Sequence, residues 1–208
     1  MNKWGDILYT ICVFISRMVF VNLLWILFSV IGLGFFGIGP ATLAAYEIFM
    51  SDDESSGMEL FVTFKNLYKK HFMDGNRIML GTYVFAAISF VNYMIIFDNL
   101  DKLEWALISY TGFFIAFLFM FINLFPVTVL SNNNFKGKIV MALFIAFRFP
   151  MYTLLQILSI IGVVAVVSQK IQFMLLFFPI LLLYVTSKVS VKVFREAKEK
   201  FSGLTLEV

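Results

Sequence analysis

The chain has 208 residues, of which 61% are apolar and 14% charged, and its formal net charge at pH 7 is +3. A soluble domain is about half apolar and about one quarter charged. No soluble fold of this length could bury so much apolar surface, so a membrane protein is expected. One cysteine and one histidine exclude an internal disulfide and do not support a metal cluster. The basic residues are spread over several loops, unlike the concentrated basic surface of a nucleic-acid-binding protein.

Six apolar segments are predicted to be transmembrane helices, because most approach the roughly 20 residues that a helix needs to cross a bilayer. In chain order they are residues 17–34, 35–51, 77–97, 105–130, 150–168 and 171–188. The strict two-residue alternation of barrel strands is missing. The expected fold is therefore all-α: a polytopic membrane protein with about six transmembrane helices as three hairpins, with short interfacial helices, in a single membrane domain over residues 1–208.

Lysine and arginine are enriched in cytoplasmic loops, and they give the predicted helices an orientation. With both termini in the cytoplasm, 14 of the 16 basic residues lie on the cytoplasmic side, all but Lys102 and Lys170. A single crossing between residues 17 and 51 would place the basic segment 58–77 opposite the N-terminus. The chain is therefore predicted to reverse on the outer side, within "GFFGIGPATLAAY" (34–46).

Three glycines and a proline interrupt the apolar run at that point, although helix interiors disfavour both residue types. Gly39 and Pro40 are predicted to form a tight outer turn or the first turn of the returning helix, where proline's missing N–H has no cost. Gly37 and Gly39 would let two backbones approach closely. Pro126 and Pro179 occupy the later outward-to-inward helices and are predicted to act in turns or packing as well.

One order of segments occurs three times, which suggests a repeat over residues 1–51, 58–130 and 136–190. Each unit has a moderately apolar segment with a basic residue, a span, a short outer turn and a proline-containing span. The spacing from arginine to proline differs among the three units. The alternative is that membrane hairpins resemble one another because one bilayer imposes the same length and charge rules on all of them.

Two cytoplasmic segments are predicted to be interfacial. Residues 58–72 place an apolar stripe opposite a basic face, as in a helix that lies in the headgroup plane. Residues 138–149 are the second such segment. Each segment lies on lipid or docks a partner, and the sequence leaves both possibilities open. The candidate partner contacts are Phe61, Phe64, Tyr68, Phe144, Phe147 and Arg148.

Polar chemistry is scarce. Glu47 is the single acid within a predicted span, and near its cytoplasmic end it is expected to have a structural role beside a basic neighbour such as Lys65. His71 is expected at the membrane surface beside Lys69 and Lys70. No catalytic residue, cofactor site or metal site is predicted, because the sequence has no catalytic triad pattern, phosphate-binding loop or zinc-protease motif. An enzyme is therefore not expected.

Three stretches carry a resemblance to a known family: "NLLWILFSVIGLGFFGIGPATLAAY" (22–46), "LFVTFKNLYKKHF" (60–72) and "KIVMALFIAFRFPMYTL" (138–154). Over about residues 15–195 the chain resembles the YesL-like family of bacterial integral membrane proteins of unknown function. The resemblance implies a bacterial plasma membrane protein with no assigned activity. It also implies a setting, because such proteins are commonly encoded beside carbohydrate ABC importers and glycan-degrading enzymes.

Three functions are therefore considered. The first is an accessory, non-catalytic subunit of a carbohydrate ABC importer, whose partners are the permease subunits and membrane lipids, with no nucleic acid. The second is an autonomous small-molecule transporter or channel, which prolines that break helices would favour. The third is a membrane assembly factor for the importer. No acid or base is predicted at midplane depth, which argues against ion coupling.

Overall fold

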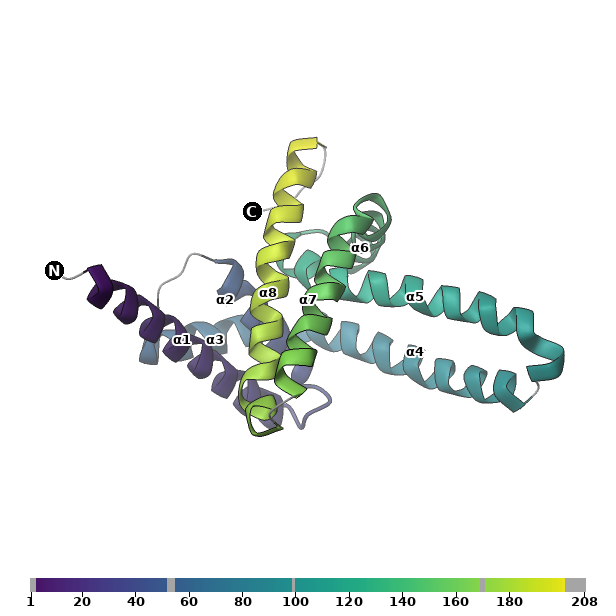
Figure 1. Ribbon diagram of the computed structural model, residues 1–208, viewed down its shortest axis with the longest axis horizontal. Helices are drawn as coiled ribbons and strands as arrows, with labels where there is room; N and C mark the ends of the chain where they lie inside the picture. The colour runs from purple at the N-terminus through teal and green to yellow at the C-terminus, as the bar shows by residue number, and fades with distance from the viewer. Residues whose placement is uncertain (1–2, 52–54, 99, 169–170, 201–208) are drawn as a thin grey trace.

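The computed structural model describes residues 3–51, 55–98, 100–168 and 171–200, and every regular element within these ranges is a helix (Figure 1). The helices are α1 (Lys3–Ile31), α2 (Ile38–Met50), α3 (Gly57–Lys70), α4 (Phe72–Asp98), α5 (Leu100–Leu130), α6 (Phe135–Arg148), α7 (Pro150–Ser168) and α8 (Ile171–Lys200). The all-α fold predicted from the sequence is confirmed.

Three of the described helices are long and apolar enough to cross a membrane: Gly5–Ile31, Phe72–Asp98 and Trp105–Leu130. The pair α6 and α7 adds a fourth crossing if it forms one broken span, bent by 92°. Helix α2 has 13 residues, so it is about 20 Å long. The hydrocarbon core is about 30 Å thick, and α2 cannot cross it alone. The structure thus supports a membrane protein with three or four apolar spans and does not confirm six.

The helices pair along the chain but do not form a simple parallel bundle. Helices α4 and α5 form a hairpin that extends away from the rest of the molecule, and α7 and α8 run side by side in a very different direction (Figure 1). The α4–α5 hairpin carries most of its apolar side chains on the surface, as expected of a lipid-exposed element. The arrangement as three hairpins of one bundle is therefore not confirmed.

Helix α2 lies at the centre, in contact with α1, α3, α4, α5 and α8. The chain enters it from the turn after α1, where Leu33 and Gly34 have φ of 58° and 74°. Gly39 and Pro40 lie in its first turn, and both are buried. A Cβ atom on Gly39 would lie 2.4 Å from the carbonyl oxygen of Gly75 in α4. The two backbones can approach this closely because neither residue has a side chain.

The other glycine and prolines of interest lie in different settings. Gly37 is the N-cap residue of α2, and a Cβ on it would lie 2.3 Å from the carbonyl oxygen of Ser29. Pro126 is buried inside α5, which continues unbroken to Leu130, so Pro126 serves packing and not a turn. Pro179 falls within the range of α8, but its side chain lies outside the described residues.

Helices α3 and α6 are alike in form. Each has 14 residues, and one residue separates each from the long helix that follows, His71 before α4 and Phe149 before α7. Their bounds lie close to the predicted interfacial segments 58–72 and 138–149. The described structure therefore contains two units of a short helix followed by a long helix.

Buried polar side chains join the helices to one another. Examples among the described residues are Trp25 Nε1 to Thr42 Oγ1 at 3.1 Å, Tyr46 with Thr186 at 2.8 Å, Asn123 Nδ2 to Thr153 Oγ1 at 3.1 Å, and Gln156 Nε2 to Ser190 Oγ at 2.8 Å. Each such bond between membrane helices contributes about 1 kcal/mol. They connect α1 with α2, α2 with α8, α5 with α7, and α7 with α8.

Candidate functional site

A cavity of about 350 Å³ lies where the ends of several helices meet. The ends of α2, α3 and α5 and the beginnings of α4 and α6 surround it. Its polar lining consists of Glu47, Ser51, Lys70, His71, Asp74, Thr128, Ser131, Asn132 and Lys138. A concave site with convergent polar groups is the usual form of a ligand-binding pocket. We call it the polar pocket.

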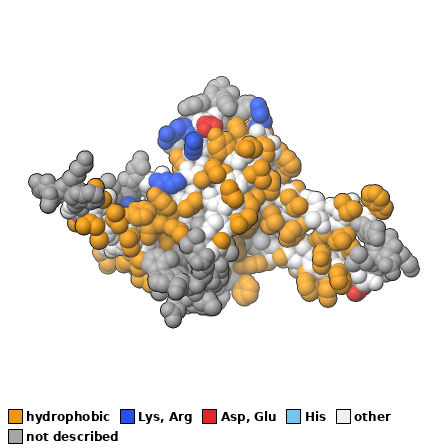
Figure 2. Space-filling view, viewed as in Figure 1, with side chains coloured by type: hydrophobic (Ala, Val, Ile, Leu, Met, Phe, Trp, Pro, Cys, Tyr) orange, Lys and Arg blue, Asp and Glu red, His pale blue; other side chains and the backbone are white. Residues whose placement is uncertain are grey.

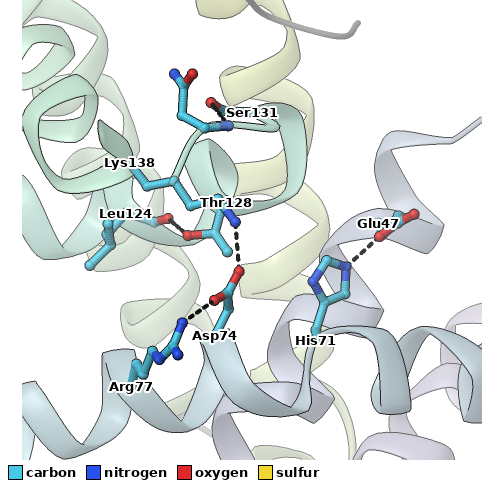
Figure 3. Close-up of polar contacts among 9 residues, drawn as sticks. Glu47, His71, Asp74, Arg77, Leu124, Thr128, Ser131 and Lys138 are labelled. Atoms are coloured by element: carbon cyan, nitrogen blue, oxygen red, sulfur yellow. Dashed lines mark hydrogen bonds and ion pairs between the residues drawn. The ribbon is translucent and has the colours of Figure 1, made fainter. Parts of the chain in front are cut away.

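One side of the polar pocket is a cluster around Glu47 (Figure 3). Helix α2 places Glu47 one turn before its end, and the end of α3 brings Lys70 and His71 to it. Lys70 Nζ lies 2.7 Å from Glu47 Oε1, and His71 Nε2 bonds to the other carboxylate oxygen. His71 is buried, whereas Lys70 is exposed at the mouth. Glu47 therefore ties α2 to the junction of α3 and α4.

These contacts correct two sequence expectations. The basic neighbours of Glu47 are Lys70 and His71 and not Lys65, and the His71 side chain is buried within the chain instead of being exposed beside Lys69 and Lys70. Glu47 lies outside the three helices long enough to span a membrane. Partial burial opposes its ionisation, but the hydrogen bonds and charges of His71 and Lys70 outweigh this and hold the pKa of Glu47 below its ordinary value.

The opposite side of the polar pocket is an ion pair between Asp74 and Lys138 (Figure 3). Lys138 Nζ lies 2.6 Å from Asp74 Oδ2, and the lysine side chain is only 10% exposed. Arg77 reaches the other carboxylate oxygen at 3.5 Å. Asp74 stands in the first turn of α4, where a negative charge is favoured. The pair therefore fastens the beginning of α6 to the beginning of α4.

The end of α5 closes the polar pocket with uncharged groups. Thr128 Oγ1 donates to the carbonyl of Leu124 at 2.7 Å, and Ser131 Oγ accepts from the backbone N–H of Asn133 at 3.3 Å. Among the described residues no group of three or more His, Cys, Asp or Glu side chains could hold a metal ion. The arrangement can bind a small polar molecule by charge and hydrogen bonding.

The partner contacts predicted on α3 are largely used by the protein itself. Phe64 is fully buried and Tyr68 is buried, and both rings pack on Phe28 of α1, at centroid distances of 5.3 and 5.0 Å. Phe61 is half-buried beside the same ring. Phe64 and Tyr68 are thus packed within the chain, and a partner contact through them stays a prediction. The apolar stripe of α3 packs on the core of its own chain.

The partner contacts predicted on α6 remain on the surface. Phe144 is 37% and Phe147 68% exposed, and Val140 on the same face is 66% exposed. Arg148 is also exposed, with its guanidinium 5.8 Å from the centre of the Phe149 ring. We call Val140, Phe144 and Phe147 the α6 stripe. Apolar side chains cover much of the visible surface elsewhere as well (Figure 2).

Several residues of the polar pocket are absent from the sequence predictions, above all Asp74 and Lys138. These two lie 64 residues apart, and their type and spacing give no signal that they meet. Glu47 and His71 carried a weak signal, as the single acid of a predicted span and the single histidine of the chain. Only the fold brings these residues around one cavity.

The fold and the site together define an all-helical membrane protein with a polar pocket at one end of its apolar hairpin. The chain belongs to the YesL-like family. It is 30% identical over 192 residues to the uncharacterized protein YesL of Bacillus subtilis strain 168, covering 91% of this chain and 90% of that protein. The uncharacterized protein YteU of the same strain is 26% identical over 147 residues, covering 69% of this chain and 65% of YteU.

Residues 18–93 also match the family described as "Protein of unknown function, DUF624". No solved structure matches the chain.

Proposed function

We propose that this protein is an accessory, non-catalytic membrane subunit associated with a bacterial carbohydrate ABC importer. In this proposal it is a multi-pass protein of the plasma membrane, with both termini cytoplasmic, and it contacts the permease subunits. The carbohydrate setting rests on what the resemblance to the YesL-like family implies. The contact surface rests on the exposed α6 stripe.

The α6 stripe carries the proposal because the opposite face of the helix already holds α6 to the protein. Met141, Ala142 and Ile145 are buried against the rest of the chain, whereas Val140 and Phe147 on the other face are 66% and 68% exposed. Association inside a membrane depends on side-chain packing, because lipid tails are as apolar as leucine. Aromatic rings provide large contact areas for such packing.

The transporter alternative has less support. Pro126 does not break α5, and the charged groups of the polar pocket lie at helix ends instead of the middle of a span. A transporter built on discontinuous helices would place its polar groups near the midplane. An accessory role requires no such pathway.

Purification from native membranes in a mild detergent, followed by quantitative mass spectrometry, tests the proposal. We expect a permease at a ratio near one to one, and we expect Phe147→Glu to abolish its recovery. Val62→Glu is the matched control, because Val62 is 47% exposed on α3. Recovery of no protein partner would favour the transporter, and a partner at a small fraction of one copy would favour the assembly factor.

A further inference from the structure

The polar pocket lies at the level where the apolar spans end. The span in α4 begins at Phe72, two residues before Asp74, and the span in α5 ends at Leu130, directly before Ser131. Lipid headgroups occupy the layer just outside the hydrocarbon core. The pocket therefore opens in the layer where the phosphate and amine groups of phospholipids are concentrated.

Acidic and basic side chains both line the polar pocket. Glu47 contacts Lys70 and His71, and Asp74 contacts Lys138. A ligand with a single sign of charge would leave one partner of a pair without a counter-charge, which is costly in a partly buried site. A ligand that carries one positive and one negative group can pair with both kinds of side chain.

The donors and acceptors in the polar pocket also suit such a ligand. Each lysine has three N–H donors, and each carboxylate can accept several hydrogen bonds. The buried Lys138 and the exposed Lys70 can donate to phosphate oxygens. Glu47 and Asp74 can accept hydrogen bonds from the N–H groups of a primary ammonium. A quaternary amine has no N–H group and cannot donate these bonds.

We propose that the polar pocket binds the headgroup of a phospholipid that carries a phosphate and a primary ammonium group, as in phosphatidylethanolamine. The acyl chains of such a lipid would lie along the start of α4. Phe72 and Met73, which adjoin Asp74, are 40% and 62% exposed and offer apolar surface there. The headgroup would thus join α2, α4 and α6 at one membrane surface.

Native mass spectrometry of the full chain in detergent, after incubation with defined lipids, measures the binding. We expect retention of phosphatidylethanolamine, with phosphatidylcholine and phosphatidylglycerol retained at least about tenfold more weakly, since hydrogen bonds to charged groups are worth 1.5 kcal/mol or more. Equal retention of phosphatidylcholine would overturn the proposal. The same headgroup could come from a membrane lipid or from a soluble molecule, and soluble phosphoethanolamine distinguishes these two sources. If phosphoethanolamine binds as tightly as phosphatidylethanolamine, a lipid ligand is excluded.

Variants of the polar pocket provide the second arm. Asp74→Asn combined with Lys138→Gln removes both charges of one pair and should weaken retention of phosphatidylethanolamine by about tenfold. Lys70→Gln changes an exposed side chain and leaves the core intact. This variant should weaken retention of phosphatidylethanolamine severalfold. Lys136→Gln, two residues from Lys138 but on the exposed face of α6, is the control and should change nothing.

If neither pocket variant alters retention while the melting temperature is unchanged, the pocket is not the site and the proposal fails. The readout is lipid retention by the isolated chain, so it is independent of any importer and of the proposed function.

Discussion

Helices α3 and α6 have the same length and the same place before a long helix, yet they use their apolar residues in opposite ways. On α3 the apolar residues Leu60, Phe64 and Tyr68 are buried, and lysines share the outer face with the exposed Met58 and Val62. On α6 the inner face is buried as well, but the outer face carries the apolar α6 stripe. Helix α3 therefore uses its aromatic residues to pack on its own chain, whereas α6 keeps part of its aromatic surface exposed.

Both helices are tied down by a charged contact at the polar pocket. The end of α3 contacts Glu47 of α2, and the start of α6 contacts Asp74 of α4 through Lys138. The anchoring of the two helices is therefore similar, and α6 differs in that aromatic rings are exposed on its outer face. We propose that a partner protein binds the outer face of α6 and not that of α3.

The largest expected loss of stability follows from removing a buried aromatic ring of α3. Phe64→Ala should lower the free energy of unfolding by about 3–5 kcal/mol, because it leaves a cavity beside Phe28. Phe147→Ala on α6 should change it by no more than about 0.5 kcal/mol. Thermal or denaturant unfolding in one detergent measures both variants. Equal losses of unfolding free energy in the two variants would contradict the burial of Phe64 and the exposure of Phe147.

A second prediction concerns the close contact between α2 and the beginning of α4, the helix that follows α3. Gly75→Ala in α4 should lower the unfolding free energy by about 1–3 kcal/mol, because its Cβ would lie 2.4 Å from the backbone nitrogen of Pro40. Gly81→Ala, on the same helix with open space around it, is the control and should be neutral or slightly stabilising. An unchanged melting temperature for Gly75→Ala would argue against close contact of α2 and α4.

The smallest expected effect is on the contact that ties α3 to α2. Because the pKa of Glu47 is held below its ordinary value, its pairing stabilises the fold at neutral pH. That contribution is lost as the pH falls through this lowered pKa. The loss should be under about 1 kcal/mol, because the contact is partly open to solvent. Glu47→Gln should remove this part of the acid destabilisation, and unfolding profiles that stay parallel at every pH would contradict the assignment.

The sequence predicted the type and position of the elements more successfully than their surroundings. The segments 58–72 and 138–149 became α3 and α6 with small shifts at their ends, because a helical period of apolar residues can be recognised locally. The same period cannot distinguish an apolar face that lies on lipid from one that packs on its own chain. For that reason the packing of Phe64 and Tyr68 on Phe28 could not be predicted.

The candidate site was harder to predict, because it depends on distant residues. The turn before Gly39 and Pro40 follows from local backbone chemistry, but the contact of Gly39 with Gly75 requires the packing of α2 on α4. The pairing of Asp74 with Lys138 likewise arises only when α4, α5 and α6 converge. Charge patterns indicate a side of the membrane and do not indicate which charges meet.

The claim that the α6 stripe contacts a partner protein is tested most directly by cross-linking in cells. A photoreactive amino acid would be placed at Phe147 on α6 and, for comparison, at Val62 on α3. We predict one defined protein adduct from position 147, identified by mass spectrometry as a permease subunit, and none from position 62. Lipid adducts alone at position 147, or the same protein adduct from both positions, would contradict the account.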